Sequence, residues 1–335
     1  MGGKLAPVVA KTRNAVRKNL PEFGPLVVAL SGGADSLALA AAVAFEAPRR
    51  GLQAHAVVVD HQLQPDSARI ARVAAQQASD MGLISEVQAV EVTYSGKGIE
   101  ADARRARYAA LADYCAKIDA TALFTGHTKN DQTEQVLLGL VRGSGTRALS
   151  GIAPERGIIK RPFLRVTRAE TEAACQAQGL SYWSDPHNED PRYTRVRVRQ
   201  TVLPVFTREL GSGVIAGLAR SAQLAREDAD ALDLFAAKVL DALQQHDHFV
   251  QGEQDTPTVV PIRTLESEPR AIAKRVLRQL LIYAGAEEVT FKHTEEVMAL
   301  LENWHGQQML QLPGVRVWRQ GKRLFMLRVL QSAAQ

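Results

Sequence analysis

The chain has 335 residues, of which 46% are hydrophobic and 23% charged, and its formal net charge is +5. This length allows two domains with substantial cores, and the composition excludes a disordered or fibrous protein. No run of about 18 apolar residues occurs and the N-terminus lacks the apolar core of a signal peptide, so we expect a cytoplasmic protein with no membrane partner.

Strand-like and helix-like patterns alternate along the first half of the chain. A basic helix is expected over 6–19. The strands that follow are expected at 25–30, 53–60, 86–92 and 121–126, and the helices at 35–46, 66–82, 99–118 and 130–142. Four β-α units predict the α/β class, with a doubly wound parallel sheet covered by helices on both faces. Ligands bind such sheets at the carboxyl ends of the strands.

The pattern changes from about residue 210. Alanine-rich helices are expected at 213–246 and 269–284, a shorter helix at 291–303, and a hairpin over 308–312 and 315–328. No catalytic pattern occurs here. We therefore predict two domains, residues 1–208 and residues 209–335, of which the second is a smaller, mainly helical α+β domain.

The positions of the cysteines and the local charge limit the kinds of site and partner that this chain is expected to have. The two cysteines, Cys115 and Cys175, are far apart and lie in helical patterns, which is typical of core residues rather than of a disulfide or a metal site. Residues 156–208 contain ten Lys/Arg and five Asp/Glu, a local surplus of five positive charges. A polyanionic partner explains this surplus, but a solvated basic face is the simpler interpretation from charge alone.

The turn after the first strand has the sequence Ser31-Gly32-Gly33-Ala34-Asp35-Ser36. The glycines allow a tight turn whose N–H groups face an anion, the serines add hydroxyl donors, and the helix that follows adds its dipole. A carboxylate at Asp35 fits phosphate binding if a divalent cation lies between the two. The turn is neither a Walker loop nor a dinucleotide motif, and an ordinary capped strand-to-helix turn is the simpler alternative.

A second polar turn follows the fourth strand and opens the next helix. His127, Asp131 and Glu134 lie at i, i+4 and i+7 there, so they are able to share one helix face. Helix capping accounts for part of this pattern, because acids are favoured in a first helical turn. Capping does not require the histidine, which is better placed than most to contact a phosphate. From the residue alone, however, a structural role is the more frequent one for such a histidine.

The turn at 31–36 resembles the pyrophosphate loop of the PP-loop ATP pyrophosphatase superfamily. Within it, the chain resembles the tRNA(Ile)-lysidine synthetase family, through residues 126–134 and a series of further blocks in the family's order. These blocks are 59–65, 99–108, 142–145, 161–164, 179–182, 185–190 and 193–204. Residues beyond 210 resemble the family only loosely, and we expect no counterpart of the further C-terminal domain of its longer members.

The resemblance implies a PP-loop (HUP-like) fold and an ATP-dependent carbon–nitrogen ligase. ATP adenylates the C2 oxygen of the wobble cytidine of tRNA(Ile) with a CAU anticodon. Free L-lysine then displaces AMP, which leaves lysidine and changes the tRNA's identity from methionine to isoleucine. ATP and Mg²⁺ are the implied cofactors, and tRNA recognition is the implied role of the C-terminal domain. The sequence is also compatible with a homodimer.

Site residues carried over from the resemblance fall into three groups. The cofactor-binding residues are Ser31, Gly32, Gly33, Ala34, Asp35 and Ser36, with Asp35 as the metal ligand. The catalytic residues are Asp35, His127, Asp131, Arg104 and Arg107. The residues for substrate or tRNA are Asp60, His61, Glu134, Arg142, Arg192, Arg195, Arg197 and Arg199. Asp131 and Glu134 are equal candidates for the carboxylate that helps lysine lose its proton.

Some positions depart from the family pattern. Asn130 stands where the family usually has Asp, and Val196 where it usually has Asn. Arg195, Arg197 and Arg199 alternate with valines, which is typical of a strand, whereas the family begins a helix there. We expect a helix.

Two alternative functions stay open. One is another PP-loop pyrophosphatase that modifies tRNA or a nucleotide. The other is a non-catalytic RNA-binding PP-loop protein. The tRNA thiolases of the superfamily generally need cysteines, and this chain has no Cys-x-x-Cys pair. Decay of the catalytic site would remove Asp35 or Ser36 first, and both are present.

Overall fold

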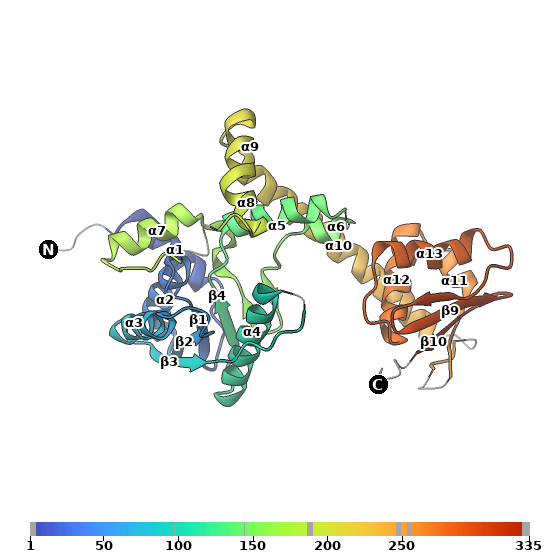
Figure 1. Cartoon of the computed structure of the whole chain (residues 1–335), viewed down its shortest axis with the longest axis horizontal. Helices are drawn as coiled ribbons and strands as arrows, with labels where there is room; N and C mark the ends of the chain where they lie inside the picture. Colours follow the sequence, from blue (N-terminus) through green and yellow to red (C-terminus); the bar gives the residue numbers. More distant parts are fainter. Residues whose placement is uncertain are drawn as a thin grey trace. The chain divides into compact units, whose positions relative to one another are not determined.

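The computed structural model describes residues 5–96, 98–143, 145–185, 190–245, 249–252 and 256–329. The chain divides into two compact units, Met1–Gln223 and Leu224–Gln335 (Figure 1). The predicted functional division at 208/209 falls inside helix α9 (Leu203–Leu210) and stays a prediction.

The N-terminal unit is built on a six-stranded sheet in the order β3-β2-β1-β4-β6-β5. All neighbouring pairs are parallel except β5 with β6. The strands are β1 (Leu26–Leu30), β2 (Ala54–Asp60), β3 (Ile84–Ala89), β4 (Ala122–Thr125), β5 (Glu155–Arg156) and β6 (Ile159–Lys160). The mainly parallel sheet confirms the predicted fold class. The chain moves outward from β1 to β3 and returns on the other side at β4, so the carboxyl ends of β1 and β4 form the switch point where ligands bind.

Helices cover both faces of this sheet, which explains why its central strands are continuous apolar runs. Helices α1 (Pro7–Arg17), α2 (Ala34–Glu46), α3 (Ser67–Asp80) and α7 (Arg168–Ala177) pack on one face in a single core cluster. Helix α4 (Ile99–Lys117) covers the other face, where its residues Leu111, Tyr114 and Cys115 pack on Val27 and Leu123 (Figure 1). Both cysteines are buried and free, as expected of core residues.

Shorter elements complete the N-terminal unit. Helix α5 (Lys129–Val141) follows β4, and α6 (Gly145–Leu149), η1 (Pro48–Arg50) and η2 (Pro162–Arg165) are short helices. The arginine-rich block begins a helix, α8 (Thr194–Arg197), which continues through a π-helical turn (Val198–Val202) into α9. The helix expected at this block is therefore confirmed, and two of its alternating valines, Val196 and Val198, are buried.

Helix α10 (Val214–Gln244) begins in the first unit and ends in the second. Among the described residues, no single helix is long and apolar enough to cross a bilayer. The bent pair Thr194–Leu210 and Val214–Gln244 meets the length and composition criteria only when both parts are counted together, which is weak evidence for a span.

The C-terminal unit combines helices with an antiparallel sheet, as its predicted α+β class requires. Strands β7 (Thr258–Pro261), β8 (Leu310–Leu312), β9 (Val315–Gln320) and β10 (Arg323–Arg328) lie in the order β7-β10-β9-β8. The expected hairpin region contains three of these strands, whereas β7 was not predicted. Helices α11 (Ile262–Glu266), α12 (Arg270–Tyr283) and α13 (Phe291–Glu302) supply the rest of its core.

Candidate active site

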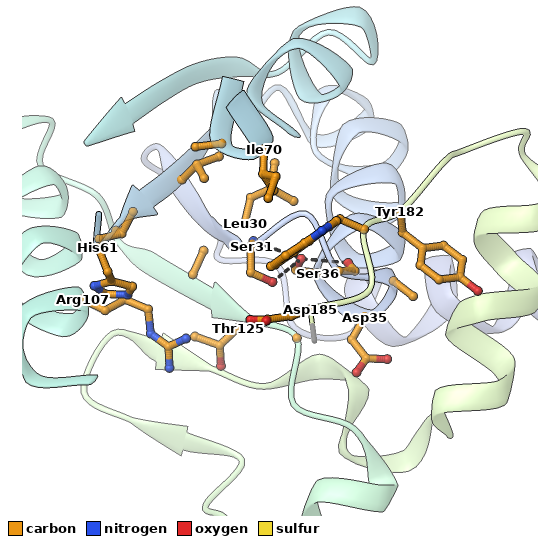
Figure 2. A pocket seen from close by; sticks show the side chains of 18 of the residues that line it. Leu30, Ser31, Asp35, Ser36, His61, Ile70, Arg107, Thr125, Tyr182 and Asp185 are labelled. Carbon is orange, nitrogen blue, oxygen red and sulfur yellow. Dashed lines mark hydrogen bonds between the residues drawn. The ribbon is translucent and has the colours of Figure 1, made fainter. Parts of the chain in front are cut away.

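The turn between β1 and α2 is preorganised by its own serines. The Ser36 hydroxyl accepts a hydrogen bond from the Ser31 amide (3.1 Å), donates to the Gly33 carbonyl (3.0 Å) and lies 3.0 Å from the Ser31 hydroxyl (Figure 2). Gly32 has φ +80°, which favours glycine, and its carbonyl accepts from the Trp183 amide (2.9 Å). A fixed turn at the start of a 13-residue helix is a ready anion site.

Asp35 points from the first turn of α2 and is held by the start of α7. The Thr171 hydroxyl donates to its Oδ1, and Arg168 Nε donates to its Oδ2 over 3.3 Å. Burial raises the pKa of Asp35 above its ordinary value, although Arg168 and the Thr171 hydrogen bond favour the ionised form. Both carboxylate oxygens therefore have partners.

The carboxyl end of β4 lies directly against this turn. A Cβ on Gly126 would lie 3.1 Å from the backbone of Asp35, so a larger residue would require this backbone to shift by a few tenths of an ångström. The next residue, His127, has its Nδ1 2.9 Å from the Thr125 hydroxyl. Burial lowers the pKa of His127 to about 4, while Asp131 acts in the opposite direction. The imidazole is therefore neutral near pH 7, when it carries one donor nitrogen and one acceptor nitrogen.

The acids of α5 are bound by arginines from α8 and the π-helical turn. Glu134 is fully buried, and its oxygens accept from Arg195 Nε and Arg199 Nε, each over 2.7 Å. Asp131 accepts two 2.7 Å hydrogen bonds from the amide and hydroxyl of Thr128, within a capping box. Burial alone would raise the pKa of Asp131, but neighbouring arginines and these hydrogen bonds outweigh it and lower the pKa.

The other end of the site lies after β2. Asp60 accepts a hydrogen bond from the Gln62 amide (2.9 Å). His61 and Arg107 lie together in Figure 2, away from the turn at 31–36. Burial and the nearby Arg107 lower the pKa of His61. In the described part of the chain, His61 Nδ1 and the Tyr108 hydroxyl are buried without a hydrogen-bond partner, so both are available to a ligand.

One cavity of about 580 Å³ joins these groups. The predicted site residues that line it are Ser31, Gly33, Ala34, Asp35, Ser36, Asp60, His61, Arg107, His127, Asp131 and Arg199. The remaining predicted residues, all described, lie outside its lining: Gly32, Arg104, Glu134, Arg142, Arg192, Arg195 and Arg197. Its size is in the range of small-ligand sites, and its position is the switch point of the sheet.

Three of the basic residues outside the cavity face solvent. Arg142 directly follows the last residue of α5, and Arg192 is 82% exposed and pairs with Asp190. Arg197 donates to the backbone carbonyls of Pro191 and Arg192, which precede α8. Pro186, Asn188 and Ser144, which belong to blocks that carry the resemblance, lie outside the described residues.

The sequence alone did not identify Arg168, Thr171 and Trp183, which all contact the turn at 31–36. These residues lie in segments that follow the sheet in the sequence. None of them stands directly after a strand, where ligand-binding residues are expected. One local signal was present: Thr167 and Glu170 form a capping box that marks the start of α7.

The carboxylates near the turn at 31–36 are the possible ligands of a metal ion in this cavity. Among the described residues, no group of three or more His, Cys, Asp or Glu side chains is arranged to hold a metal ion. Mg²⁺ on a nucleotide usually takes only one or two carboxylates together with phosphate oxygens. Asp35 and Asp131, which both contact Arg168, are carboxylates of the kind that such a nucleotide-bound metal would use.

Two family models and one solved structure match parts of this chain. Residues 6–206 match the family model of the PP-loop domain, and residues 261–325 match that of the TilS substrate binding domain. The U34-tRNA thiolase NcsA from Methanococcus maripaludis has a similar fold, with a TM-score of 0.54 and 16% identity over 65% of this chain and 80% of that chain. At this identity the likeness shows the fold alone.

Sequence relatives show the family. The chain is 47% identical over 296 residues to the tRNA(Ile)-lysidine synthase of Leifsonia xyli, covering 88% of this chain and 87% of that protein. It is 45% identical over 332 residues to the tRNA(Ile)-lysidine synthase of Salinispora arenicola, covering 96% of each. The protein therefore belongs to the tRNA(Ile)-lysidine synthase family.

Proposed function

We propose that this protein ligates free L-lysine to C2 of the wobble cytidine of tRNA(Ile) with a CAU anticodon, consuming ATP and releasing AMP and pyrophosphate. The product, lysidine, switches both codon reading and charging from methionine to isoleucine. The observation that carries the proposal is the meeting of the turn at 31–36 with His127 and Asp131 in one cavity, in a chain that belongs to this family.

The reaction has two displacements. The cytosine O2 attacks the α-phosphorus of ATP; this O–P bond forms as the bond to the bridging oxygen breaks, and pyrophosphate leaves. The neutral ε-amine of lysine then attacks C2, the C2–O bond breaks, and AMP leaves with the oxygen while the amine gives up a proton. Activation is needed because the C2 oxygen is a poor leaving group until it is esterified.

The described side chains are suited to these steps. The amides and hydroxyls of the turn at 31–36 hold phosphate oxygens, and Asp35 would hold Mg²⁺, which would neutralise phosphate charge. The neutral His127 donates a hydrogen bond to the α-phosphate. Asp131 receives the lysine proton, because it lines the cavity, whereas Glu134 is fully buried and lies outside the lining.

Base and tRNA contacts are assigned by position. Arg107, His61 and the Tyr108 hydroxyl at the far end of the cavity contact the cytosine or its adenylate. The exposed Arg192 and Arg197 contact the tRNA backbone, because RNA is recognised largely through its phosphates and splayed bases. Residues 1–208 form the adenylating domain and residues 209–335 the tRNA-recognition domain, which includes the matched TilS substrate binding domain.

Other functions within the fold class have less support. A thiolase needs reactive cysteines, whereas Cys115 and Cys175 are buried and burial raises their pKa values to about 11 and about 12. A binding protein without catalysis has no need for the ordered contacts around Asp35. We also propose a cytoplasmic location and a homodimer, the latter to be tested by light scattering.

AMP release tests the function. The protein is incubated with ATP, Mg²⁺, lysine and a CAU-anticodon tRNA(Ile) transcript, and each component is omitted in turn. We expect AMP and lysidine only with all of them, and a loss of at least about a hundredfold in Asp35→Ala. Asp113→Ala, on an exposed position of α4, is the matched control. AMP release that needs no lysine, or that uses ammonia with a GMP precursor, would overturn the proposal.

A further inference from the structure

Arg168 places one guanidinium between the acids of two helices. It is the first residue of α7, and its Nε donates to Asp35 Oδ2 over 3.3 Å. Its Nη2 lies 3.4 Å from Asp131 Oδ1, and its Nη1 lies 3.9 Å from Glu134 Oε1. No other described side chain contacts both Asp35 and Asp131 through an ion pair.

The backbone of Arg168 is fixed, while its side chain reaches the cavity. Its amide donates to Asn130 Oδ1 over 3.0 Å, and the amide of Lys129 donates to the carbonyl of Val166 over 2.8 Å. These two bonds tie the start of α7 to the start of α5. The side chain remains 24% exposed and lines the cavity together with Ser31 and Ser36. The guanidinium is therefore positioned on the phosphate side of the site.

The partners of Asp35 compete with a metal. Arg168 and Thr171 occupy both of its carboxylate oxygens, which a magnesium ion on the same carboxylate would need. A magnesium ion that bound Asp35 together with a polyphosphate would displace Arg168 from this carboxylate, and the polyphosphate would offer Arg168 a new anion within the same cavity. A guanidinium suits this exchange because its planar donors bind phosphate oxygens as well as carboxylates.

We propose that Arg168 is a polyphosphate-contacting residue that holds Asp35 in the nucleotide-free protein and donates to phosphate oxygens when Mg²⁺ and ATP bind. This inference rests on the proposed function, which makes ATP the substrate of the cavity. It assigns a role in ATP binding to α7, a helix that follows the sheet and is far from the turn at 31–36 in sequence.

A structural ion pair makes a different prediction from a phosphate contact. If Arg168 only neutralises Asp35 and the neighbouring Asp131 and Glu134, Arg168→Lys keeps that charge and leaves ATP binding unchanged in the Asp35→Asn background. If Arg168 contacts phosphate, its removal weakens ATP binding in either background. A double-mutant cycle therefore separates the two roles.

The experiment measures the Kd of ATP, with and without Mg²⁺, by calorimetry on the full chain without tRNA. The variants are Arg168→Gln, Asp35→Asn and the double variant. In the Asp35→Asn background we expect Arg168→Gln to weaken ATP binding by about tenfold, the scale of one charge-assisted hydrogen bond. No further loss in that background would overturn the proposal.

Two further variants serve as a control and as a substitute in this experiment. Arg165→Gln is the matched control, because Arg165 is exposed, contacts Gln223 and does not line the cavity; its Kd should equal that of the wild type. Arg168→Lys keeps the charge and replaces Arg168→Gln if that variant does not fold. We expect Arg168→Lys to weaken ATP binding less than Arg168→Gln does. If Arg168→Lys leaves the Kd of ATP unchanged in the Asp35→Asn background, Arg168 does not contact phosphate. A wild type that binds ATP but forms no lysidine would refute the proposed function and leave the Arg168 result standing.

Discussion

Glu134→Gln tests whether the arginines of the site depend on a buried acid. The Glu134 side chain is fully buried and accepts three hydrogen bonds from Arg195 and Arg199, at 2.7, 2.7 and 3.1 Å. Glutamine keeps the shape but removes the charge, and its amide group turns two donors toward a guanidinium. Two arginines then share a pocket without the acid that binds them most closely.

The expected cost follows from the burial of the two partners. Removing one member of a fully buried ion pair costs about 3–5 kcal/mol. Arg195 and Arg199 retain 30% and 27% exposure, so water compensates part of the loss. We expect the free energy of unfolding to fall by about 2–4 kcal/mol, which lowers the Tm of the N-terminal unit by about 5–10 °C.

Thermal and urea unfolding followed by circular dichroism measure this loss. Glu91→Gln is the matched control, because Glu91 is exposed in the same unit and should change stability by less than about 0.5 kcal/mol. Removing Arg195 as well should restore part of the stability of Glu134→Gln, since it takes away one unpaired charge.

Two outcomes would refute this reasoning. If Glu134→Gln is as stable as Glu91→Gln, the ion pairs contribute no net stability and the arginines are held by other contacts. If the variant is stable but releases no AMP, Glu134 acts on the substrate, as the sequence resemblance allows, and Asp131 is not the sole proton acceptor.

Three other substitutions or treatments probe separate parts of the chain. Arg197→Ala should weaken tRNA binding severalfold and reduce the slope of log K against log salt by about one, as measured by filter binding at several salt concentrations. Gly32→Ala should cost about 1–2 kcal/mol in urea unfolding, because φ is +80° there, and should also weaken ATP binding in calorimetry. Cys115 and Cys175 should resist a thiol reagent at mildly alkaline pH until denaturant is added, because both are buried and have raised pKa values.

The central strands could be predicted because helices cover both sheet faces, which makes β1, β2 and β4 continuous apolar runs. Strand β3, at the sheet edge, is only partly buried, and its predicted bounds of 86–92 therefore lie beyond the observed Ile84–Ala89. Strands β5 and β6 have two residues each, too few to give a periodic signal. These two strands form because β6 pairs with β4 and β5 pairs with β6, and no local sequence pattern predicts them.

The site also contains residues whose positions could be predicted from the sequence and residues whose positions could not. Asp35 and His127 could be predicted to meet, because each lies within a few residues after the end of a strand and parallel strands bring their carboxyl ends to one edge. Arg168 reaches Asp35 from a helix 133 positions later in the chain, and no periodicity encodes that distance. Its capping box predicts where α7 starts but not which acid its first residue binds.

Charge balance gives a physical reason for this arrangement. Asp35 and Asp131 line a cavity that admits a polyanion, and the buried Glu134 shares arginine partners with Asp131. The arginines at 168, 195 and 199 offset the charge of these three acids. Asn130 accepts a hydrogen bond from the Arg168 amide through an uncharged oxygen. A fourth carboxylate there would add repulsion toward ATP without being needed to fix the helix. The side-chain amide of Asn130 therefore holds the backbone of Arg168 in place. The guanidinium of Arg168 stays available to the acids of the site and to phosphates.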